Sequence, residues 1–337
     1  MTISRLAILD DYQGVARDCV DWSAAQGVAI VPFRDHVEDE DELVARLADF
    51  DAVMRIRERT ALPRTVLQRL PRLKLILATG MRNARSIDLS TADEQGIVVS
   101  TTDALHQTTV EITWVLILGL FRNIPQEMAS LRAGAWQVGL GQGLAGKTLG
   151  IVGLGNMGIP VARIGQAFGM EVVAWSPNLT PQRCAPHGVT CVSKSELFSH
   201  ADAISLHMPL ADATVGLVGD REIRSMKSTA YLINTARPQL IDEAALISAL
   251  AQRRIGGAGL DVYCLEPLPK DHAYRTLPNV LATPHIGFVT QENYRIFFEQ
   301  SRDNLVAYLQ GCPINTITAA RPFLPESQVG QQRGTAG

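Results

Sequence analysis

The sequence predicts an α/β protein made of two doubly wound domains. Short apolar runs alternate with amphipathic helical stretches along most of the chain, and a glycine-rich turn joins one such run to a helix near the middle. The length of 337 residues exceeds what one hydrophobic core usually serves. We therefore expect two cores, each built on a parallel sheet with helices around it.

The first hundred residues contain five candidate strands separated by candidate helices. The helix over 40–50 places Leu43, Leu47 and Phe50 on one face, and the helix over 87–95 is followed by Gly96, a typical C-terminal cap. A shorter helix is expected over 63–70. The candidate strands are 5–9, 28–33, 52–56, 73–79 and 97–100. This alternation predicts a parallel sheet.

A long apolar helix over 108–123, resumed after Pro125 as far as Leu131, leads into a second α/β region. Its expected strands are 147–153, 171–175, 189–192, 203–207, 230–234, 257–262 and 280–283, and its expected helices are 157–168, 194–199, 220–226 and 242–253. The amphipathic helix over 291–309 comes too late to belong to this sheet, so we expect it to pack on the first domain. The tail from Pro322 is expected to be disordered.

Composition and charge disfavour several classes of function. Lys plus Arg number 31 and Asp plus Glu number 34, so the net charge is −3 (31 − 34), and no basic cluster stands out. This balance disfavours binding to nucleic acids or to membrane surfaces. The most apolar run, 114–121, is too short to cross a bilayer, and no signal-peptide pattern is present. Five scattered cysteines without a Cys-x-x-Cys pair disfavour disulfides and a structural zinc site, so we expect no metal. This cysteine usage is typical of a reducing compartment, so we expect a cytoplasmic location.

A dinucleotide-binding fingerprint, Gly-Leu-Gly-Asn-Met-Gly, occupies residues 153–158 between an expected strand and an expected helix. Gly153 permits a tight turn, Gly155 lets the backbone approach a pyrophosphate, and Gly158 lets the helix pack closely on the strand. The helix N-terminus adds N–H donors and the positive end of the helix dipole. The motif alone is a weak signal, but here the strand and helix that it requires are both expected. We therefore predict that NAD or NADP binds here.

The end of the following strand bears on the choice between NAD and NADP. An Asp or Glu at this position would bind the ribose hydroxyls of NAD, whereas this chain has Ser176-Pro177-Asn178. Arg183 is the nearest cation that could attract the 2′-phosphate of NADP, unless it is simply a solvated helix residue. The choice stays open, with a slight preference for NAD.

Three polar residues follow later strands of the second region: Arg237, Glu266 and His285. Ligands of open parallel sheets gather at the carboxyl ends of the strands. Each residue alone could have a structural role, as a surface pair, a solvated loop residue or a turn histidine. Their recurrence at three strand ends beside a nicotinamide site favours catalysis.

The chain resembles the D-isomer-specific 2-hydroxyacid dehydrogenase family over roughly residues 5–315. The matching stretches are 146–150 with the fingerprint at 153–158, and then 206–210, 233–237, 259–263 with 266–267, and 283–287. The resemblance implies two Rossmann-like doubly wound domains. A flavodoxin-like substrate domain would cover 1–102 and 288–337, and an inserted NAD(P)-binding domain would cover 103–287.

The resemblance also implies an activity, hydride transfer between a nicotinamide cofactor and a small 2-keto acid or its D-2-hydroxy acid. Arg237 would bind the substrate carboxylate and carbonyl, and His285, paired with Glu266, would be the general acid and base. The residues expected around the cofactor are Gly153, Gly155, Asn156, Met157, Gly158, Ser176, Asn178, His207, Pro209, Thr235, Ala236, Asp261 and Gly287.

Two departures from the family pattern concern the substrate. Pro238 stands where the family usually has Gly, so any substrate contact through that N–H is lost. The loop over 79–84 reads Thr-Gly-Met-Arg-Asn-Ala where the family commonly has a Gly-rich segment. We expect the backbone N–H groups of Gly80 and Met81 and the charge of Arg82 to hold the substrate carboxylate. A surface arginine is the alternative for Arg82.

The apolar segment 110–131 bears on assembly. We expect one domain to have difficulty burying Trp114, Leu116, Leu118 and Phe121 alone, and an exposed patch of that kind usually marks an interface. The sequence therefore predicts a homodimer through this segment.

Two other functions fit parts of the pattern. The 3-hydroxyacid dehydrogenases carry a similar fingerprint, but near the chain start and with a catalytic lysine. An NAD-sensing, corepressor-like binding protein could use the same fold without catalysis. The presence of Arg237, Glu266 and His285 together favours an enzyme.

Overall fold

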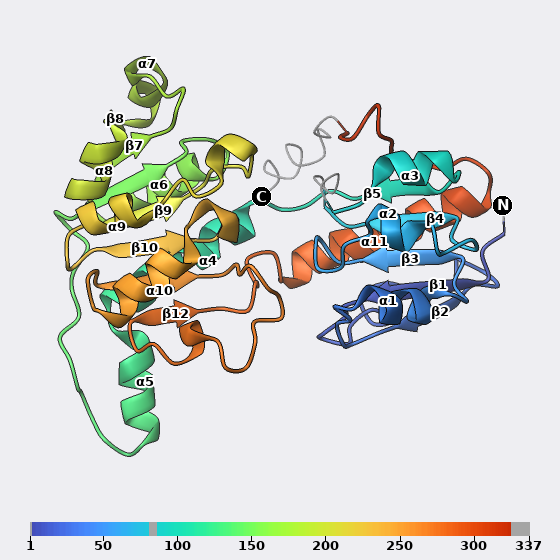
Figure 1. Ribbon diagram of the computed structural model, residues 1–337, viewed down its shortest axis with the longest axis horizontal. Coiled ribbons are helices and arrows are strands. Elements are labelled where there is room, and N and C mark those ends of the chain that lie inside the picture. Colours follow the sequence, from blue (N-terminus) through green and yellow to red (C-terminus); the bar gives the residue numbers. More distant parts are fainter. Residues whose placement is uncertain (1, 81–85, 325–337) are drawn as a thin grey trace, which may run out of the picture. The chain divides into compact units, whose positions relative to one another are not determined.

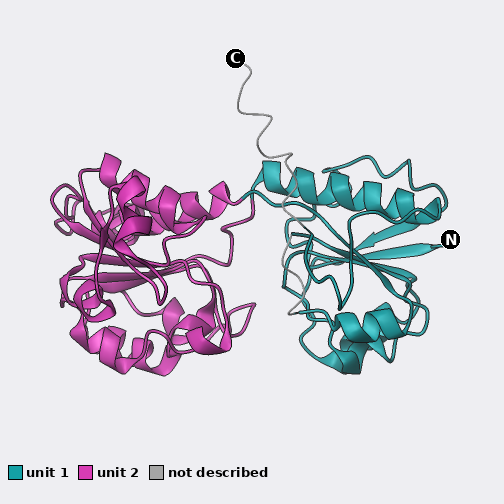
Figure 2. Cartoon of the chain, turned by 90° about the horizontal axis from the view of Figure 1, so that it is seen from above, with its two compact units in different colours: residues 1–105, 290–337 teal, residues 106–289 magenta. Residues whose placement is uncertain are grey.

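The computed structural model describes residues 2–80 and 86–324, which form two compact units (Figures 1 and 2). Unit 1 comprises Met1–Leu105 and Thr290–Gly337, and unit 2 comprises His106–Val289. The sequence analysis expects the two divisions after residues 102 and 287.

Unit 1 is built on a six-stranded sheet with the order β13-β5-β4-β3-β1-β2. Its parallel part has the strand order of flavodoxin-like folds. The parallel strands are β1 (Arg5–Leu9), β2 (Ala29–Pro32), β3 (Ala52–Arg55), β4 (Leu75–Ala78) and β5 (Val98–Thr101). The helices are α1 (Glu40–Leu47), α2 (Arg64–Leu67), α3 (Leu89–Glu94) and α11 (Gln291–Leu309). As predicted, α11 belongs to this unit, where it packs on β4 and β5.

One edge of this sheet differs from the prediction. The two-residue strand β13 (Thr316–Ile317) pairs antiparallel with β5, so the sheet is mixed rather than wholly parallel. The Ile317 side chain is buried in the core beside Val99. A strand of two residues is too short to leave a periodic pattern, which is why the sequence did not indicate it.

Unit 2 contains a seven-stranded parallel sheet with the order β12-β11-β10-β9-β6-β7-β8. This is the Rossmann order with one further strand at the edge. The strands are β6 (Thr148–Val152), β7 (Glu171–Trp175), β8 (Thr190–Cys191), β9 (Ala203–Leu206), β10 (Tyr231–Asn234), β11 (Gly257–Leu260) and β12 (Val280–Ala282). The helices are α4 (Gln107–Phe121), α5 (Ile124–Arg132), α6 (Gly158–Ala167), α7 (Pro181–Cys184), α8 (Lys194–His200), α9 (Asp220–Ser225) and α10 (Glu243–Ala251).

The predicted fold class, two doubly wound α/β domains, is confirmed. Each expected strand is present with ends within two residues of the expected ones. The structure adds α7 and β13, which the sequence analysis did not expect. Among the described residues, no helix is both long enough and apolar enough to cross a membrane.

Helix α4 corrects the reasoning about the dimer. Its Trp114, Leu116 and Phe121 side chains are buried inside unit 2, where α4 packs on β10, β11 and α6. The contact is close: a Cβ atom on Gly259 of β11 would lie 3.0 Å from Leu116 Cβ. A helix that is apolar on all sides is one that other elements cover. These side chains are therefore core residues, and the expectation that the unit could not bury them is wrong.

Candidate active site

The predicted site residues of unit 2 gather at one edge of its sheet. Because all seven strands are parallel, the segments that follow their carboxyl ends lie along the same edge. The cofactor and catalytic residues that the sequence predicts in unit 2 all lie in the segments that follow β6, β7, β9, β10, β11 and β12, with Gly158 as the first residue of α6. The edge therefore carries the candidate cofactor and catalytic residues together.

The turn between β6 and α6 has the shape that a pyrophosphate requires. Gly153 has a φ of +100°, and a Cβ there would lie 2.8 Å from the carbonyl oxygen of His207. A Cβ on Gly158, the first residue of α6, would collide with the carbonyl oxygen of Gly153. A Cβ on Gly155 would meet nothing within 4 Å, so space is open beside the turn that Asn156 and Met157 complete. The three glycines thus fit a bound dinucleotide at the N-terminus of α6.

The loop after β7 places Ser176 and Asn178 at or near the surface. Arg183 of α7 folds back on this loop, and its Nη1 donates to the backbone oxygen of Asn178 at 3.2 Å. The guanidinium is therefore held against the loop that follows β7, the loop that the sequence analysis associates with the adenosine ribose. This geometry is compatible with both NAD and NADP.

His207 follows β9, and its Nε2 lies 2.9 Å from Ser205 Oγ. Burial lowers the pKa of His207 to about 4, so its imidazole is neutral at pH 7. Pro209 lies two residues further on, where its backbone oxygen accepts a hydrogen bond from Thr214 Oγ1 at 2.8 Å. His207 is thus suited to shaping the site rather than to carrying a proton.

The turn that carries Arg237 is clamped by a buried side chain. Asn234, the last residue of β10, donates from Nδ2 to the backbone oxygen of Arg237 at 2.9 Å and accepts from the backbone N–H of Ala236 at 3.0 Å. Arg237 Nη1 donates to the backbone oxygen of Ala236 at 2.7 Å. Before this turn, Thr235 Oγ1 lies 2.8 Å from Thr113 Oγ1 of α4.

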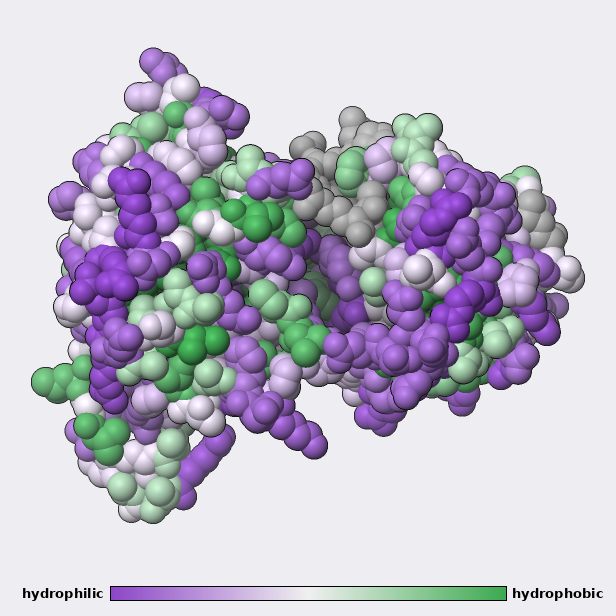
Figure 3. Space-filling view, viewed as in Figure 1, coloured by the Kyte–Doolittle hydropathy of each residue, from purple (hydrophilic) through white to green (hydrophobic). Residues whose placement is uncertain are grey.

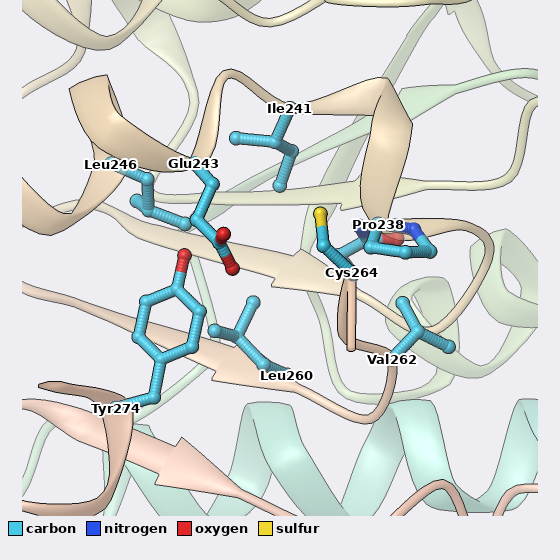
Figure 4. A pocket seen from close by; sticks show the side chains of 9 residues that line it. Pro238, Ile241, Glu243, Leu246, Leu260, Val262, Cys264 and Tyr274 are labelled. Atoms are coloured by element: carbon cyan, nitrogen blue, oxygen red, sulfur yellow. The ribbon is translucent and has the colours of Figure 1, made fainter. Parts of the chain in front are cut away.

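Pro238 is accommodated because it begins a short 3₁₀ turn, Pro238–Leu240. The first position of a helical turn needs no N–H and suits the fixed φ of proline. The Pro238 ring also lines a small cavity behind the turn (Figure 4). Its other walls include Ile241, Glu243, Cys264 and Tyr274. Pro238 therefore has a packing role that a glycine would not supply.

His285 and Glu266 form a close pair. His285 Nδ1 lies 2.6 Å from Glu266 Oε2, and both side chains are 26 % exposed. The second carboxylate oxygen, Oε1, accepts from the backbone N–H of Tyr263 at 2.9 Å. His285 has a φ of +52°, a left-handed conformation that few residues other than glycine adopt. An accessible imidazole in such a turn is a candidate for function.

Asp261 holds the turn on which His285 lies. Its carboxylate is buried and accepts from Thr283 Oγ1 at 2.6 Å and from the backbone N–H groups of Ile286 and Gly287 at 2.9 and 2.8 Å. Burial raises the pKa of Asp261. A Cβ on Gly287 would lie 2.9 Å from Asp261 Oδ2, which explains why glycine stands there. The family resemblance places Asp261 and Gly287 near the nicotinamide, and the structure adds that they brace the histidine turn.

The substrate loop of unit 1 is described only as far as Gly80; Met81 and Arg82 lie outside the described residues. The backbone N–H of Gly80 donates to Thr102 Oγ1 at 2.9 Å, so the group expected to hold a substrate carboxylate already has an acceptor. Gly80 has a φ of +85°, and a Cβ there would collide with Nη1 of Arg57. The Arg57 side chain forms an ion pair with its neighbour, with Arg57 Nε 3.5 Å from Glu58 Oε2.

A second histidine–carboxylate pair lies in unit 1, and the sequence analysis missed it. His36 Nδ1 is 2.9 Å from Asp10 Oδ1, and Thr60 Oγ1 donates to Asp10 Oδ2. The Asp10 side chain is 1 % exposed and that of His36 is 13 % exposed. The hydrogen bond to Asp10 raises the pKa of His36. The available signal was a polar residue directly after β1, the same kind of position that identified Arg237 and His285.

Comparison with known proteins identifies the family. The model for the D-isomer specific 2-hydroxyacid dehydrogenase, NAD binding domain, matches residues 114–287, which lie within unit 2. A glyoxylate reductase from Thermococcus litoralis is 38 % identical over 258 residues, which is 73 % of this chain and 77 % of that protein. A D-3-phosphoglycerate dehydrogenase from Methanocaldococcus jannaschii is 37 % identical over 296 residues, 87 % of this chain but 56 % of that protein, so this chain spans little more than half its length.

The solved structures agree with the sequence comparisons. A phosphoglycerate oxidoreductase from Vibrio cholerae o395 superposes with a TM-score of 0.87 at 37 % identity, covering 91 % of this chain and 99 % of that one. Unit 2 has the glycine turn, the strand order and the open N-terminus of α6 that dinucleotide binding requires. The chain belongs to the D-isomer specific 2-hydroxyacid dehydrogenase family.

Proposed function

We propose that the chain is an NAD(P)-dependent oxidoreductase that interconverts a small 2-keto acid and its D-2-hydroxy acid. The observation that carries this proposal is the pair of His285 and Glu266, 2.6 Å apart and accessible, on the sheet edge that also carries the glycine turn. The relatives named above support the proposal because they are reductases or dehydrogenases. None of the comparisons favours the corepressor-like alternative.

Arg237 is suited to binding a 2-keto acid. Its guanidinium presents a planar set of N–H donors that matches a carboxylate and the neighbouring carbonyl oxygen. The Asn234 side chain hydrogen-bonds the backbone oxygen of Arg237 and the backbone N–H of Ala236, so the backbone that carries the guanidinium is held in place. A positive group beside the carbonyl also stabilises the charge that develops on its oxygen during reduction.

His285 is suited to supplying the proton. Nδ1 is engaged by Glu266, so transfer to the substrate oxygen goes through Nε2. Glu266 fixes the orientation of the ring and stabilises the imidazolium form that gives up the proton. When bound, the reduced nicotinamide supplies the hydride that goes to the carbonyl carbon. In the reverse reaction, neutral His285 takes the proton from the substrate hydroxyl.

The activity is tested by following nicotinamide absorbance with a panel of 2-keto acids, using NADH and NADPH in parallel. We expect turnover of at least one small 2-keto acid, and the ratio of kcat/KM for the two cofactors decides their preference. Binding of NADH without turnover of any panel member would contradict the proposal and favour the binding-protein alternative.

The role of Arg237 has its own test. Arg237→Ala is expected to lower kcat/KM about 10²–10³-fold, as loss of a donor to a developing oxyanion does, and to leave the Kd of NADH unchanged. Arg221→Ala, at an exposed arginine of α9, is the matched control and is expected to keep wild-type kinetics. Equal effects of the two substitutions would remove Arg237 from the site.

For the substrate loop, the proposal rests on the sequence. Arg82 is proposed to bind the substrate carboxylate, with the backbone of Met81 as a second donor. Arg82→Ala should raise KM for 2-keto acids and leave the Kd of the cofactor alone. An unchanged KM across the panel would show that Arg82 is a surface residue.

A homodimer is also proposed, through an arm formed by residues 123–143 rather than through α4. The arm has a defined fold: Glu127 accepts from the backbone N–H of Gly139 at 2.9 Å, and Ser130 Oγ donates to the backbone oxygen of Trp136 at 2.6 Å. It nevertheless exposes many apolar side chains, seen over α5 and the following segment at the lower left of Figure 3. These are Ile124, Met128, Leu131, Trp136, Val138 and Leu140. An ordered, exposed apolar surface favours burial against a second copy.

Light scattering at micromolar concentration tests the dimer. We expect twice the chain mass for the wild type and the chain mass for a Trp136→Glu, Leu140→Glu double variant. Val215→Glu, at an exposed apolar residue outside the arm, should stay dimeric. A wild-type mass of one chain would overturn this part of the proposal. The cytoplasmic location expected from the sequence stays a prediction.

A further inference from the structure

Tyr263 contacts both strands that carry the candidate acid–base pair. It is a buried residue three positions after the end of β11. Its hydroxyl lies 3.0 Å from the backbone oxygen of Leu260 and 2.8 Å from that of Thr283, which directly follows β12. Its backbone N–H donates to Glu266 Oε1 at 2.9 Å. One residue therefore contacts the carboxylate of the pair and the strand that leads to the histidine.

The Thr283 carbonyl is the link to His285. The same oxygen that faces the Tyr263 hydroxyl accepts from the backbone N–H of His285 at 2.9 Å. The ladder between β11 and β12 ends nearby, with the Thr283 N–H donating to the Leu260 oxygen at 2.9 Å. The Tyr263 hydroxyl thus extends the connection between the two strands beyond the last ladder hydrogen bond.

The histidine turn needs such a restraint. His285 has a left-handed backbone conformation, which persists only where the surroundings fix it. Asp261 holds the far side of the turn through Ile286 and Gly287. Tyr263 holds the near side through Thr283. Burial raises the pKa of Tyr263, so its hydroxyl keeps its proton as a donor.

We propose that Tyr263 is a positioning residue that sets the geometry between His285 and Glu266 through its hydroxyl and its backbone N–H. This inference rests on the proposed function insofar as the pair transfers a proton. We expect Tyr263 to affect the chemical step rather than cofactor binding, because Tyr263 lies in the segment that carries Glu266 and not in the glycine turn.

The test compares Tyr263→Phe with Tyr274→Phe. The first substitution removes one oxygen and keeps the ring in the core. The second removes the hydroxyl of a neighbouring buried tyrosine, whose ring centroid lies 6.3 Å from that of Tyr263 and which lines the cavity of Figure 4. We expect Tyr263→Phe to lower kcat about fivefold, the effect typical of one neutral hydrogen bond, with the Kd of NADH unchanged. Tyr274→Phe should keep the wild-type kcat.

A double-variant cycle separates positioning from a general structural role. In a His285→Asn background, Tyr263→Phe should have no further effect on kcat, because the group that it positions is gone. Additive losses in the double variant, or equal losses in the Tyr263→Phe and Tyr274→Phe variants, would overturn the proposal.

A second readout does not depend on turnover. With ¹⁵N-labelled histidine, the Nδ1 proton of His285 in its hydrogen bond to Glu266 should give a downfield NMR signal. We expect this signal to shift or broaden in Tyr263→Phe and to be unchanged in Tyr274→Phe. An unchanged signal in Tyr263→Phe would contradict the positioning role. If the expected pattern is seen while the wild type reduces no 2-keto acid, the proposed function fails and the positioning stands.

Discussion

Two histidine–carboxylate pairs, one in each unit, have similar hydrogen bonds and very different surroundings. In unit 1, His36 Nδ1 lies 2.9 Å from a carboxylate that is 1 % exposed. In unit 2, His285 Nδ1 lies 2.6 Å from Glu266, and both partners are 26 % exposed. Asp10 also accepts from Thr60 Oγ1, and its backbone oxygen accepts from Arg59 Nη1 at 2.8 Å. The unit 1 pair is thus enclosed, and the unit 2 pair is partly exposed within its unit.

The pairing of an imidazole with a carboxylate does not by itself indicate catalysis. A buried pair that is fully hydrogen-bonded fixes the conformation of the chain, and breaking it is costly. A pair that is partly open can exchange a proton with a bound molecule. We therefore propose a stabilising role for the Asp10–His36 pair and proton transfer for the Glu266–His285 pair.

The largest effect should follow from neutralising the carboxylate in unit 2. Glu266→Gln is expected to lower kcat about 10²-fold or more, because an amide cannot stabilise the imidazolium and can favour the wrong tautomer of His285. Absorbance of the nicotinamide measures this loss. The matched change in unit 1, Asp10→Asn, should leave the kcat per folded molecule unchanged. Equal losses of kcat in both variants would contradict a catalytic role that belongs to the unit 2 pair alone.

The effects on stability should be reversed. Asp10→Asn should lower the free energy of unfolding by about 3 kcal/mol, because the neutral amide gives up the charge-assisted hydrogen bonds that the buried carboxylate makes with His36 and Thr60. Asn tolerates the φ of +58° at this position, so the backbone is kept. Glu266→Gln, at a partly exposed pair, should cost less than about 1 kcal/mol. Urea unfolding measures both, and a larger loss for Glu266→Gln would contradict the assignment.

A smaller effect, with a defined pH dependence, is expected at His36. The folded-state pKa of His36 is raised by Asp10, so the charged pair stabilises the fold fully below the unfolded pKa of about 6.5. This contribution is lost as the pH rises through the folded-state pKa. His36→Gln should therefore cost about 1.5–3 kcal/mol at pH 5.5 and clearly less at pH 9. A loss that does not change with pH would show that His36 acts by packing rather than by charge.

Most of the fold, and the candidate site residues of unit 2, could be predicted from the sequence. The strands of unit 2 are bounded by turn residues, and Arg237, Glu266 and His285 lie in the loops that follow three of them, so position singled them out and the family resemblance gave them roles; those roles stay predictions. The glycine turn could be predicted from its motif, and in the structure a Cβ on Gly153 or Gly158 would collide with backbone atoms, whereas Gly155 leaves open space beside the turn. Residues 81–82 of the substrate loop lie outside the described residues, so this part of the prediction stays open.

The parts that the sequence did not indicate depend on tertiary contacts. Asn234 and Tyr263 lie inside the recognised motifs, but they act on backbone groups that only the folded strands bring near them. Asp10 and His36 are 26 positions apart, and nothing in their local patterns connects them. The sequence predicts an interface around Trp114 because a single domain is expected to have difficulty burying its apolar side chains, whereas the sheet and α6 bury Trp114, Leu116 and Phe121.

The most direct test of the assignment is a single-turnover measurement on two variants, His285→Asn and His36→Asn. Each would be loaded with NADH, mixed with the preferred 2-keto acid and followed by stopped-flow absorbance at a pH where both are folded. We predict that His285→Asn slows the reaction about 10²–10⁴-fold with the Kd of NADH near normal, while His36→Asn stays close to the wild type. Retention of more than about a tenth of the wild-type rate by His285→Asn, given that expected range, would contradict the account.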